Sequence, residues 1–232
     1  MTGSIGHLAW ATGAFVGTHL LLSWPPLRRR LVDVLGLWPF RGLYSLVAVV
    51  SLVWMVWGFQ AAPRLELWFP PIALRHLPAG LMLPAALLIV GGYTVVNPTA
   101  LGLENMAVGR PIPGIIKITR HPVMWGVGLW ALTHMLALGD GASLIFFGGL
   151  AGLALGGAWA IDRRRAREKD ADWARLATQT SYWPFLALLE GRTRLSLSEI
   201  GWARLAGGLV LYGLMVVWHA YVLGVAPLPL PG

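Results

Sequence analysis

The chain has 232 residues, of which 56% are hydrophobic and only 12% are charged. A soluble domain carries about 25% charged residues because its surface must face water, so this composition excludes a water-soluble globular protein and predicts an integral membrane protein. The formal net charge of +8 does not indicate a nucleic-acid-binding protein, because the basic residues lie in loops between apolar runs and do not cluster on one face.

Six apolar runs are long enough for membrane-spanning helices, which need about 20 mainly apolar residues to cross about 30 Å of hydrocarbon. In chain order they are residues 4–24, 41–62, 78–96, 122–139, 143–161 and 201–225. The first run lacks a basic leader and an A-x-A-type cleavage site, so we interpret it as a span and not as a signal peptide. We therefore expect an all-α fold, a polytopic membrane helical bundle that forms a single membrane domain over residues 1–232.

The basic residues set the expected orientation of these spans. Sixteen of the 18 lie in or next to three segments, residues 25–40, 97–121 and 162–200. Only Arg64 and Arg75 lie on the other side. Cytoplasmic loops of membrane proteins carry the excess of Lys and Arg, so we predict a bacterial-type inner-membrane protein with these three segments cytoplasmic and both termini outside the cytoplasm. The lipid bilayer is the expected partner, with anionic lipids at the basic loops.

The segment 162–200 mixes charges of both signs with spaced apolar residues. This pattern predicts a helix that lies along the cytoplasmic interface. Glycines repeat every four residues in two of the spans, and we interpret them as flat strips at which helices pack closely. These strips are Gly13 and Gly17 in the first span, and Gly148, Gly152 and Gly156 in the fifth.

Histidines inside a bilayer are candidate site residues, because ionisable groups are costly and rare there. His121 and His134 lie in one run but cannot share a ligand on a straight helix, since thirteen residues give about 20 Å of rise and about 220° of rotation. His121 lies at the cytoplasmic mouth beside Pro122, which suits a first helical turn. It is either a cap and anchor or a functional residue. Three further histidines, His7, His76 and His219, are expected at the outer interface, and His19 and His134 remain as the candidates within the bilayer.

His134 lies deep among Leu, Ala, Trp and Met residues. A buried imidazole needs a partner for its N–H and for its lone pair, and the candidates are the Trp130 carbonyl, another helix or a metal. His19 lies near the cytoplasmic end of the first span. With about 1.5 Å of rise per residue, His19 is about 8 Å and His134 about 18 Å from the cytoplasmic boundary, an offset that a tilted haem b between two helices tolerates.

Missing motifs exclude most other chemistry. The chain has no cysteine, which excludes disulfides, thiolate ligands and c-type haem attachment. It has no H-E-x-x-H, G-x-S-x-G, P-loop or G-x-G-x-x-G motif. Acidic residues near the membrane are few, which disfavours paired-carboxylate catalysis and hard-metal sites. An imidazole-ligated iron or haem remains open.

Several stretches, through their order and spacing, resemble the NnrU family of membrane proteins, which is named for a denitrification-linked gene and is homologous to plant and algal zeta-carotene isomerase. They are "GTHLLLSWPPLRRRL" (17–31), "FRGLYSLVAVVSLVWMVWGF" (40–59), "KITRHPVMWGVGLWALTHMLALGD" (117–140), "DRRR" (162–165), "TSYWPF" (180–185) and "EGR" (190–192). The resemblance covers almost the whole chain.

The resemblance implies a haem b-dependent enzyme that isomerises a central cis double bond of a membrane-dissolved polyene, with ferrous haem required. It implies His19 and His134 as axial ligands of the haem iron, and His121 as a residue beside the ligands or an alternative ligand. The isomerases have a cysteine three residues before the histidine of the fourth span. Ala131 stands at that position here, so ligation by a thiol is not expected.

Two other functions stay open. The same histidines would serve a haem or redox accessory protein of nitrogen-oxide (denitrification) metabolism that has no turnover of its own. "RHPVMWG" (120–126) also resembles the R-H-P-x-Y-x-G stretch of the isoprenylcysteine carboxyl methyltransferases, which implies S-adenosylmethionine as a cofactor. Trp125 replaces the usual tyrosine and no clear acidic pair follows, so we interpret this likeness as a shared scaffold.

Overall fold

A computed structural model describes residues 3–97, 111–168 and 171–227. Most of the predicted loop 97–121, with Arg110, lies outside the described residues, as does Lys169. The described chain is all α-helical apart from one isolated bridge between Glu66 and Asp140.

Five of the described helices are long and apolar enough to cross a membrane, and they make the chain an integral membrane protein. They are α1 (Ile5–Ser23), α3 (Leu37–Ala61), α4 (Ile72–Tyr93), α7 (Gly141–Glu168) and α11 (Trp202–Leu223). They coincide with five of the six expected spans. The run expected as the fourth span, 122–139, forms α6 (Pro122–Leu138), which is apolar but only 17 residues long.

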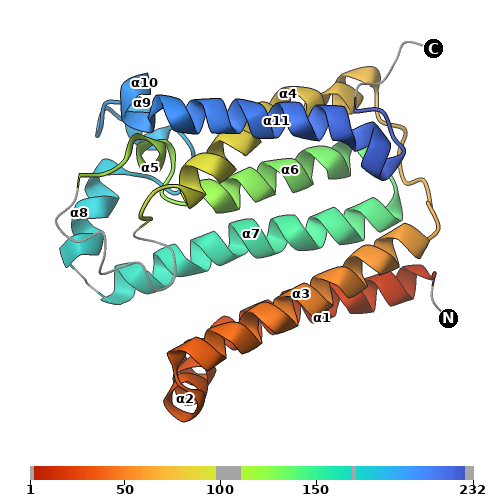
Figure 1. Cartoon of the computed structure of the whole chain (residues 1–232), viewed down its shortest axis with the longest axis horizontal. Helices are drawn as coiled ribbons and strands as arrows, with labels where there is room; N and C mark the ends of the chain where they lie inside the picture. The colour runs from red at the N-terminus through yellow and green to blue at the C-terminus, as the bar shows by residue number, and fades with distance from the viewer. Residues whose placement is uncertain (1–2, 98–110, 169–170, 228–232) are drawn as a thin grey trace.

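The long helices lie side by side in an order that differs from their order in the sequence. α3 packs against α1, α1 against α7, α7 against α6, α6 against α4, and α4 against α11. Figure 1 shows them running roughly along one direction, with α7 between the α1–α3 pair and the other three. Because α6 is enclosed between α4 and α7, it is the helix least available to lipid.

Capping residues and prolines set where these helices begin and end. The Ser4 hydroxyl accepts a hydrogen bond from the backbone N–H of His7 at 3.0 Å and so caps α1. Pro122 begins α6, and Gly139 ends it with a φ of 70°, a conformation that favours glycine. α4 begins six residues before the predicted position and contains Pro78 and Pro84. Prolines are tolerated in membrane helices because neighbouring groups satisfy the freed backbone atoms.

Among the described residues, five short helices lie between the long ones. They are α2 (Pro25–Leu35), α5 (Gly114–Ile118), α8 (Ala171–Gln179), α9 (Leu186–Leu189) and α10 (Leu197–Ile200). α8 falls in segment 162–200, where one helix was predicted, and the other four short helices were not predicted. The arginine-rich start of segment 162–200 does not begin a separate interfacial helix, because it continues α7 to Glu168. Extending a formed helix adds one hydrogen bond for each residue fixed, and Arg has a good helix propensity.

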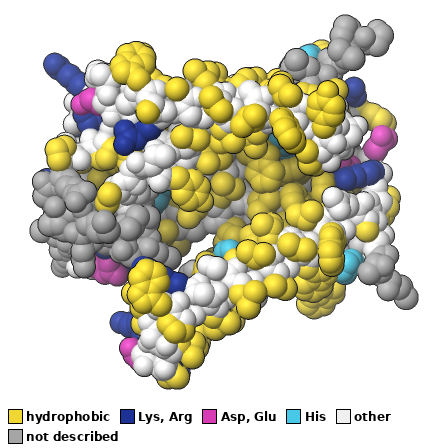
Figure 2. Space-filling model, viewed as in Figure 1, with side chains coloured by type: hydrophobic (Ala, Val, Ile, Leu, Met, Phe, Trp, Pro, Cys, Tyr) yellow, Lys and Arg dark blue, Asp and Glu magenta, His cyan; other side chains and the backbone are white. Residues whose placement is uncertain are grey.

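Two buried apolar clusters hold the helices together. One joins α1, α3, α6 and α7 around Phe15, Met55 and Phe146, and the other joins α4, α5, α6 and α8 around Ile115 and Trp173. Large apolar side chains also cover the outside, as Figure 2 shows. In lipid such exposure costs little, because the surrounding hydrocarbon is as apolar as the side chains.

The glycines at close helix contacts are not the ones predicted from the sequence. A Cβ on Gly126 of α6 would lie 2.6 Å from Cγ1 of Ile89 and 2.8 Å from the Ala85 carbonyl oxygen in α4. Among the predicted strip residues, only Gly148 has a described neighbour within 4 Å of such a Cβ, Sδ of Met135 at 3.8 Å, which is an ordinary contact; Gly13, Gly17, Gly152 and Gly156 have none. Spacing alone misplaced the packing strips, because it says nothing about which face of a helix meets a neighbour.

Candidate functional site

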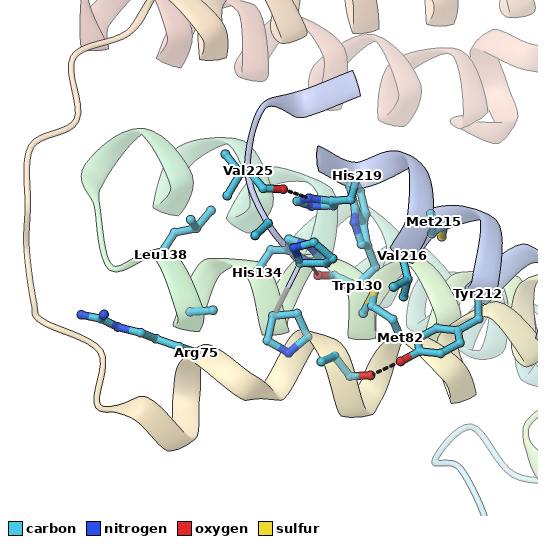
Figure 3. Close-up of a pocket in the computed structure, with 15 residues that line it drawn as sticks. Arg75, Met82, Trp130, His134, Leu138, Tyr212, Met215, Val216, His219 and Val225 are labelled. Carbon is cyan, nitrogen blue, oxygen red and sulfur yellow. Dashed lines mark hydrogen bonds between the residues drawn. The ribbon is translucent and has the colours of Figure 1, made fainter. Parts of the chain in front are cut away.

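A cavity of about 490 Å³ lies between α4, α6 and α11, as Figure 3 shows. Most of its lining is apolar or aromatic, and the polar side chains are those of Arg75, His134, Tyr212 and His219. Among the described residues, the lining consists of Arg75, Pro78, Ala79, Met82, Trp130, His134, Ala137, Leu138, Tyr212, Met215, Val216, His219, Val225, Ala226 and Pro227. Ligand pockets of this size and apolar character commonly bind small molecules.

His134 lines this cavity from α6 and is half-buried. Its Nδ1 donates a hydrogen bond to the Trp130 carbonyl at 2.8 Å, and its ring stacks on Phe147 with 5.3 Å between centroids. With the N–H of a neutral imidazole on Nδ1, Nε2 keeps a free lone pair. In metal sites, a histidine that binds the metal through one ring nitrogen is commonly oriented by a hydrogen bond that its other ring nitrogen donates.

His219 lines the same cavity from α11. Its Nδ1 donates to the carbonyl of Val225 at 2.6 Å, across the turn that Gly224 makes with a φ of 69°. Figure 3 shows the His219 side chain on α11 and the His134 side chain on α6 at the same cavity. The sequence indicated only an interfacial role for His219. His134 and His219 each lie four residues before the last residue of their helix. This equal spacing could have indicated that the two histidines lie at similar depth.

The other two polar side chains of the cavity are already engaged. The hydroxyl of Tyr212 donates to the Ala79 carbonyl at 2.9 Å and thereby links α11 to α4. Nε of Arg75 donates to the Pro70 carbonyl at 3.0 Å at the outer rim. The Tyr212 hydroxyl is thus already hydrogen-bonded and Arg75 is a cation, so neither side chain supplies a general acid or base to the cavity. The arrangement therefore suits binding of an apolar, membrane-dissolved molecule next to imidazole nitrogens.

His19 lies away from this cavity, on α1. Its Nδ1 donates to the Phe15 carbonyl at 2.7 Å, and the ring contacts Phe15 and Tyr44. His19 is four residues from the end of α1 that precedes the basic α2, about 6 Å of rise, whereas His134 is twelve residues, about 18 Å, from the start of α6 on that side. α7 packs against both α1 and α6. The structure therefore does not bring His19 and His134 together, and their joint ligation of a haem stays a prediction.

His121 lies at the opposite end of α6 from the cavity and is 2% exposed. Its Nε2 is 2.5 Å from Oδ1 of Asp162 in α7, and the other carboxylate oxygen, Oδ2, accepts a hydrogen bond from Arg120 at 3.0 Å. The Arg120 guanidinium also donates to the Thr180 carbonyl at 2.8 Å and lies over the ring of Trp173. The partnership with Asp162 was not predicted, although an acidic residue at the end of an apolar span was a usable signal.

The loop 180–185 closes over this cluster through its backbone. The Tyr182 carbonyl accepts from Thr119 and from Nε1 of Trp125, both at 2.8 Å, and the Ser181 carbonyl accepts from the backbone N–H of Arg120 at 3.0 Å. Burial and the negative charge of Asp162 raise the pKa of Tyr182. The stretches "RHP", "DRRR" and "TSYWPF", far apart in the sequence, thus meet in one buried polar cluster.

The remaining histidines have structural positions. Nε2 of His7 accepts a hydrogen bond from Nε1 of Trp54 at 2.7 Å, so that nitrogen is engaged. His76 is exposed on α4. Within the described residues no three His, Cys, Asp or Glu side chains come together as a metal site. Any metal-centred cofactor here would therefore depend on one or two imidazoles.

Comparison with known proteins places these features in a family. The model of the family described as NnrU protein matches residues 7–227 of the chain. The chain is also similar to two proteins named 15-cis-zeta-carotene isomerase, chloroplastic: it is 40% identical over 95 residues to that of Arabidopsis thaliana and 38% identical over 98 residues to that of Zea mays. These matches cover 39% and 40% of this chain but 26% and 27% of the relatives, so the chain spans about a quarter of the curated relatives it matches. No solved structure matches the chain significantly.

Proposed function

The chain belongs to the NnrU family, and on this premise we propose that it is a membrane isomerase that acts on a lipid-soluble polyene with haem b as its cofactor. The distant similarity to the two zeta-carotene isomerases supports the reaction class. The observation that carries the proposal is the apolar cavity at His134, whose imidazole is anchored through Nδ1 and keeps Nε2 for a ligand.

The chemical character of the lining side chains suits a planar aromatic cofactor as well as an apolar polyene. Trp130, Met82 and Met215 give it an aromatic and polarisable wall, which binds hydrocarbon without desolvating polar groups. The two imidazoles that line it are neutral-nitrogen donors of the kind that ligate haem iron. The donor set therefore fits haem b, with His134 as the proposed ligand.

The reaction makes few demands on acid and base groups. A cis-to-trans rotation conserves every atom and electron, so no proton needs to be delivered, and none of the described residues that line the cavity carries a carboxylate. When bound, the haem iron would supply a transient electronic interaction that lowers the barrier to rotation about the double bond. The apolar walls bind the polyene in a fixed orientation and exclude water, while the bond from His134 to Trp130 holds the imidazole in one orientation.

The proposed membrane arrangement keeps six spans, with α6 as the fourth. At one end of the bundle the α6–α7 turn is tied to the α3–α4 loop, since the N–H of Leu67 donates to the Gly139 carbonyl at 2.9 Å. At the other end, Arg120 beside the start of α6 is tied to the loop at Ser181. Seventeen residues extend about 25 Å, which suffices for a helix enclosed by two longer neighbours. The basic segments then lie on the cytoplasmic side and the cavity in the outer half of the membrane.

The other predicted site residues are His19 and His121. The resemblance implies His19 as the axial ligand opposite His134, but His19 lies on α1 and does not line this cavity, so the proposal names only His134 as a ligand. His121 would act from a distance, because Asp162 already engages its Nε2 and because twelve residues of α6, about 18 Å of rise, separate its end of the helix from His134.

An isomerisation assay tests the proposal. The purified protein, loaded with haem in liposomes that contain 15-cis-zeta-carotene, should convert it to the trans isomer after reduction, as followed by chromatography. His134→Ala should abolish the conversion, whereas His7→Ala, which changes a histidine at the outer end of α1, should retain it. Haem binding without any conversion would favour the accessory role in nitrogen-oxide metabolism. Tight binding of S-adenosylmethionine without haem would favour the methyltransferase.

A further inference from the structure

We infer that His219 is the second imidazole of the His134 site, so that a haem is held between α6 and α11. The inference rests on the proposed function, because it names the protein group on the second side of the same cofactor. It differs from the ligand pair implied by family resemblance, in which His19 is the partner of His134.

The geometry of the two helices favours this pair. α6 and α11 run in the same direction, since each begins beside the basic loops, and both pack against α4. His134 and His219 each lie four residues before the end of their helix, Leu138 and Leu223 respectively, and so lie at similar depth. The cavity separates the two helices and both imidazoles line it.

The hydrogen bonds leave the same nitrogen available on both rings. Nδ1 of His134 donates to the carbonyl of Trp130 and Nδ1 of His219 donates to the carbonyl of Val225. Within the described part of the chain, no hydrogen bond to Nε2 of either ring is formed. Two neutral imidazoles that offer Nε2 to one apolar cavity are a suitable axial pair for a haem iron.

The end of the chain adds a constraint on His219. Gly224 turns the chain back, and Val225, Ala226 and Pro227 line the cavity beside the helices. The bond from His219 to Val225 therefore fixes this part of the cavity wall and the ring at the same time. By contrast, the His19 ring contacts Phe15 and Tyr44. Within the described chain, it forms no ring contact or hydrogen bond with a residue that lines this cavity.

Haem spectroscopy on single variants distinguishes the two pairs. The full-length protein in detergent is titrated with haemin, and spectra are recorded oxidised and reduced for wild type and for His134→Ala, His219→Ala, His19→Ala and His7→Ala. We expect a six-coordinate, low-spin bis-imidazole spectrum in wild type, and its loss in both His134→Ala and His219→Ala. His19→Ala and the matched outer-end control His7→Ala should keep the wild-type spectrum.

A second variant separates ligation from folding. His219→Gly should lose the low-spin spectrum and regain it when free imidazole is added, which a merely misfolded protein would not do. The inference is overturned if His219→Ala keeps the wild-type spectrum, whatever His19→Ala does, and this result leaves the proposed function intact. A wild-type protein that takes up no haem overturns both. Bis-imidazole spectra that depend on His219 in a protein without isomerase activity would support the inference and count against the proposed reaction.

Discussion

Oδ1 of Asp162 lies 2.5 Å from Nε2 of His121, so the carboxylate near the end of α7 holds the imidazole that precedes α6. The same carboxylate pairs with Arg120. The side chains of these three residues are at most 15% exposed. This ion pair joins α6 and α7 at the end of α6 opposite the His134 cavity, and its first role is to position these two helices.

Replacing Asp162 should therefore destabilise the protein. Asp162→Asn keeps the size of the side chain but leaves the buried Arg120 charge without its carboxylate partner. Removing one member of a buried pair costs about 3 kcal/mol, and we expect a loss of about that size in the free energy of unfolding in detergent. Asp33→Asn, at an exposed position on α2, should change it by less than about 0.5 kcal/mol. Equal effects of the two substitutions would show that the cluster is not stabilising.

The close contact between α4 and α6 predicts a second stability difference. Gly126→Ala forces a Cβ against Ile89 and the Ala85 carbonyl, and such overpacking costs about 1–3 kcal/mol. Gly152→Ala, on α7, meets no described neighbour within 4 Å and should be neutral or slightly stabilising, because Ala has the better helix propensity. Thermal unfolding of both variants measures the difference. A Gly152→Ala protein that is the less stable of the two would contradict the packing order described here.

The contribution of Glu199 to the stability of the folded protein should depend on pH. The hydrogen bond from Lys117 to Oε1, 2.6 Å long, and that from the backbone N–H of Ser196 lower the pKa of this carboxyl. A carboxyl whose pKa is lowered by folding stabilises the folded state above its ordinary pKa, and this contribution is lost as the pH falls through the lowered value. Glu199→Gln should thus have a lower melting temperature than wild type at pH 7, and the difference should vanish in acid. A difference that persists undiminished at about pH 3 would assign the effect to lost packing.

The absence of cysteine makes the six-span arrangement directly testable. Single cysteines at Asp33 and Ser198 lie on the side of the basic loops, and a cysteine at Leu65 lies in the α3–α4 loop on the other side. In intact cells, a membrane-impermeant maleimide should label the Leu65→Cys protein, whereas Asp33→Cys and Ser198→Cys should react only after the membrane is opened. Labelling of all three in intact cells would refute the proposed orientation.

Much of the fold could be predicted from apolar run length. Five spans are present close to the expected positions because a long apolar helix can satisfy its backbone only within itself in lipid. Charge signals were less reliable. The third span was placed at 78–96, whereas α4 begins at Ile72, because a helix near the interface accommodates polar side chains such as Arg75 and His76 at its end. The helix α2 was missed because three consecutive arginines resemble a loop, although its opening prolines are typical of a first helical turn.

The candidate site was only partly predictable. His134 was singled out because its depth follows from its position in the run, and in the structure it lines the cavity; its role as a ligand stays a prediction. Which histidine shares that space depends on which helices neighbour α6, and spacing along one helix contains no such information. For the same reason the contact between His121 and Asp162 was not predicted, since 41 residues separate them in the sequence.

The absorption spectrum of the freshly purified protein, oxidised and then reduced, tests haem binding at His134 most directly. Wild type should show a haem Soret band that shifts on reduction, and this band should be weakened or displaced in His134→Ala, while His7→Ala matches wild type. A wild-type protein that shows no such band, even after incubation with haemin, would contradict haem binding at His134.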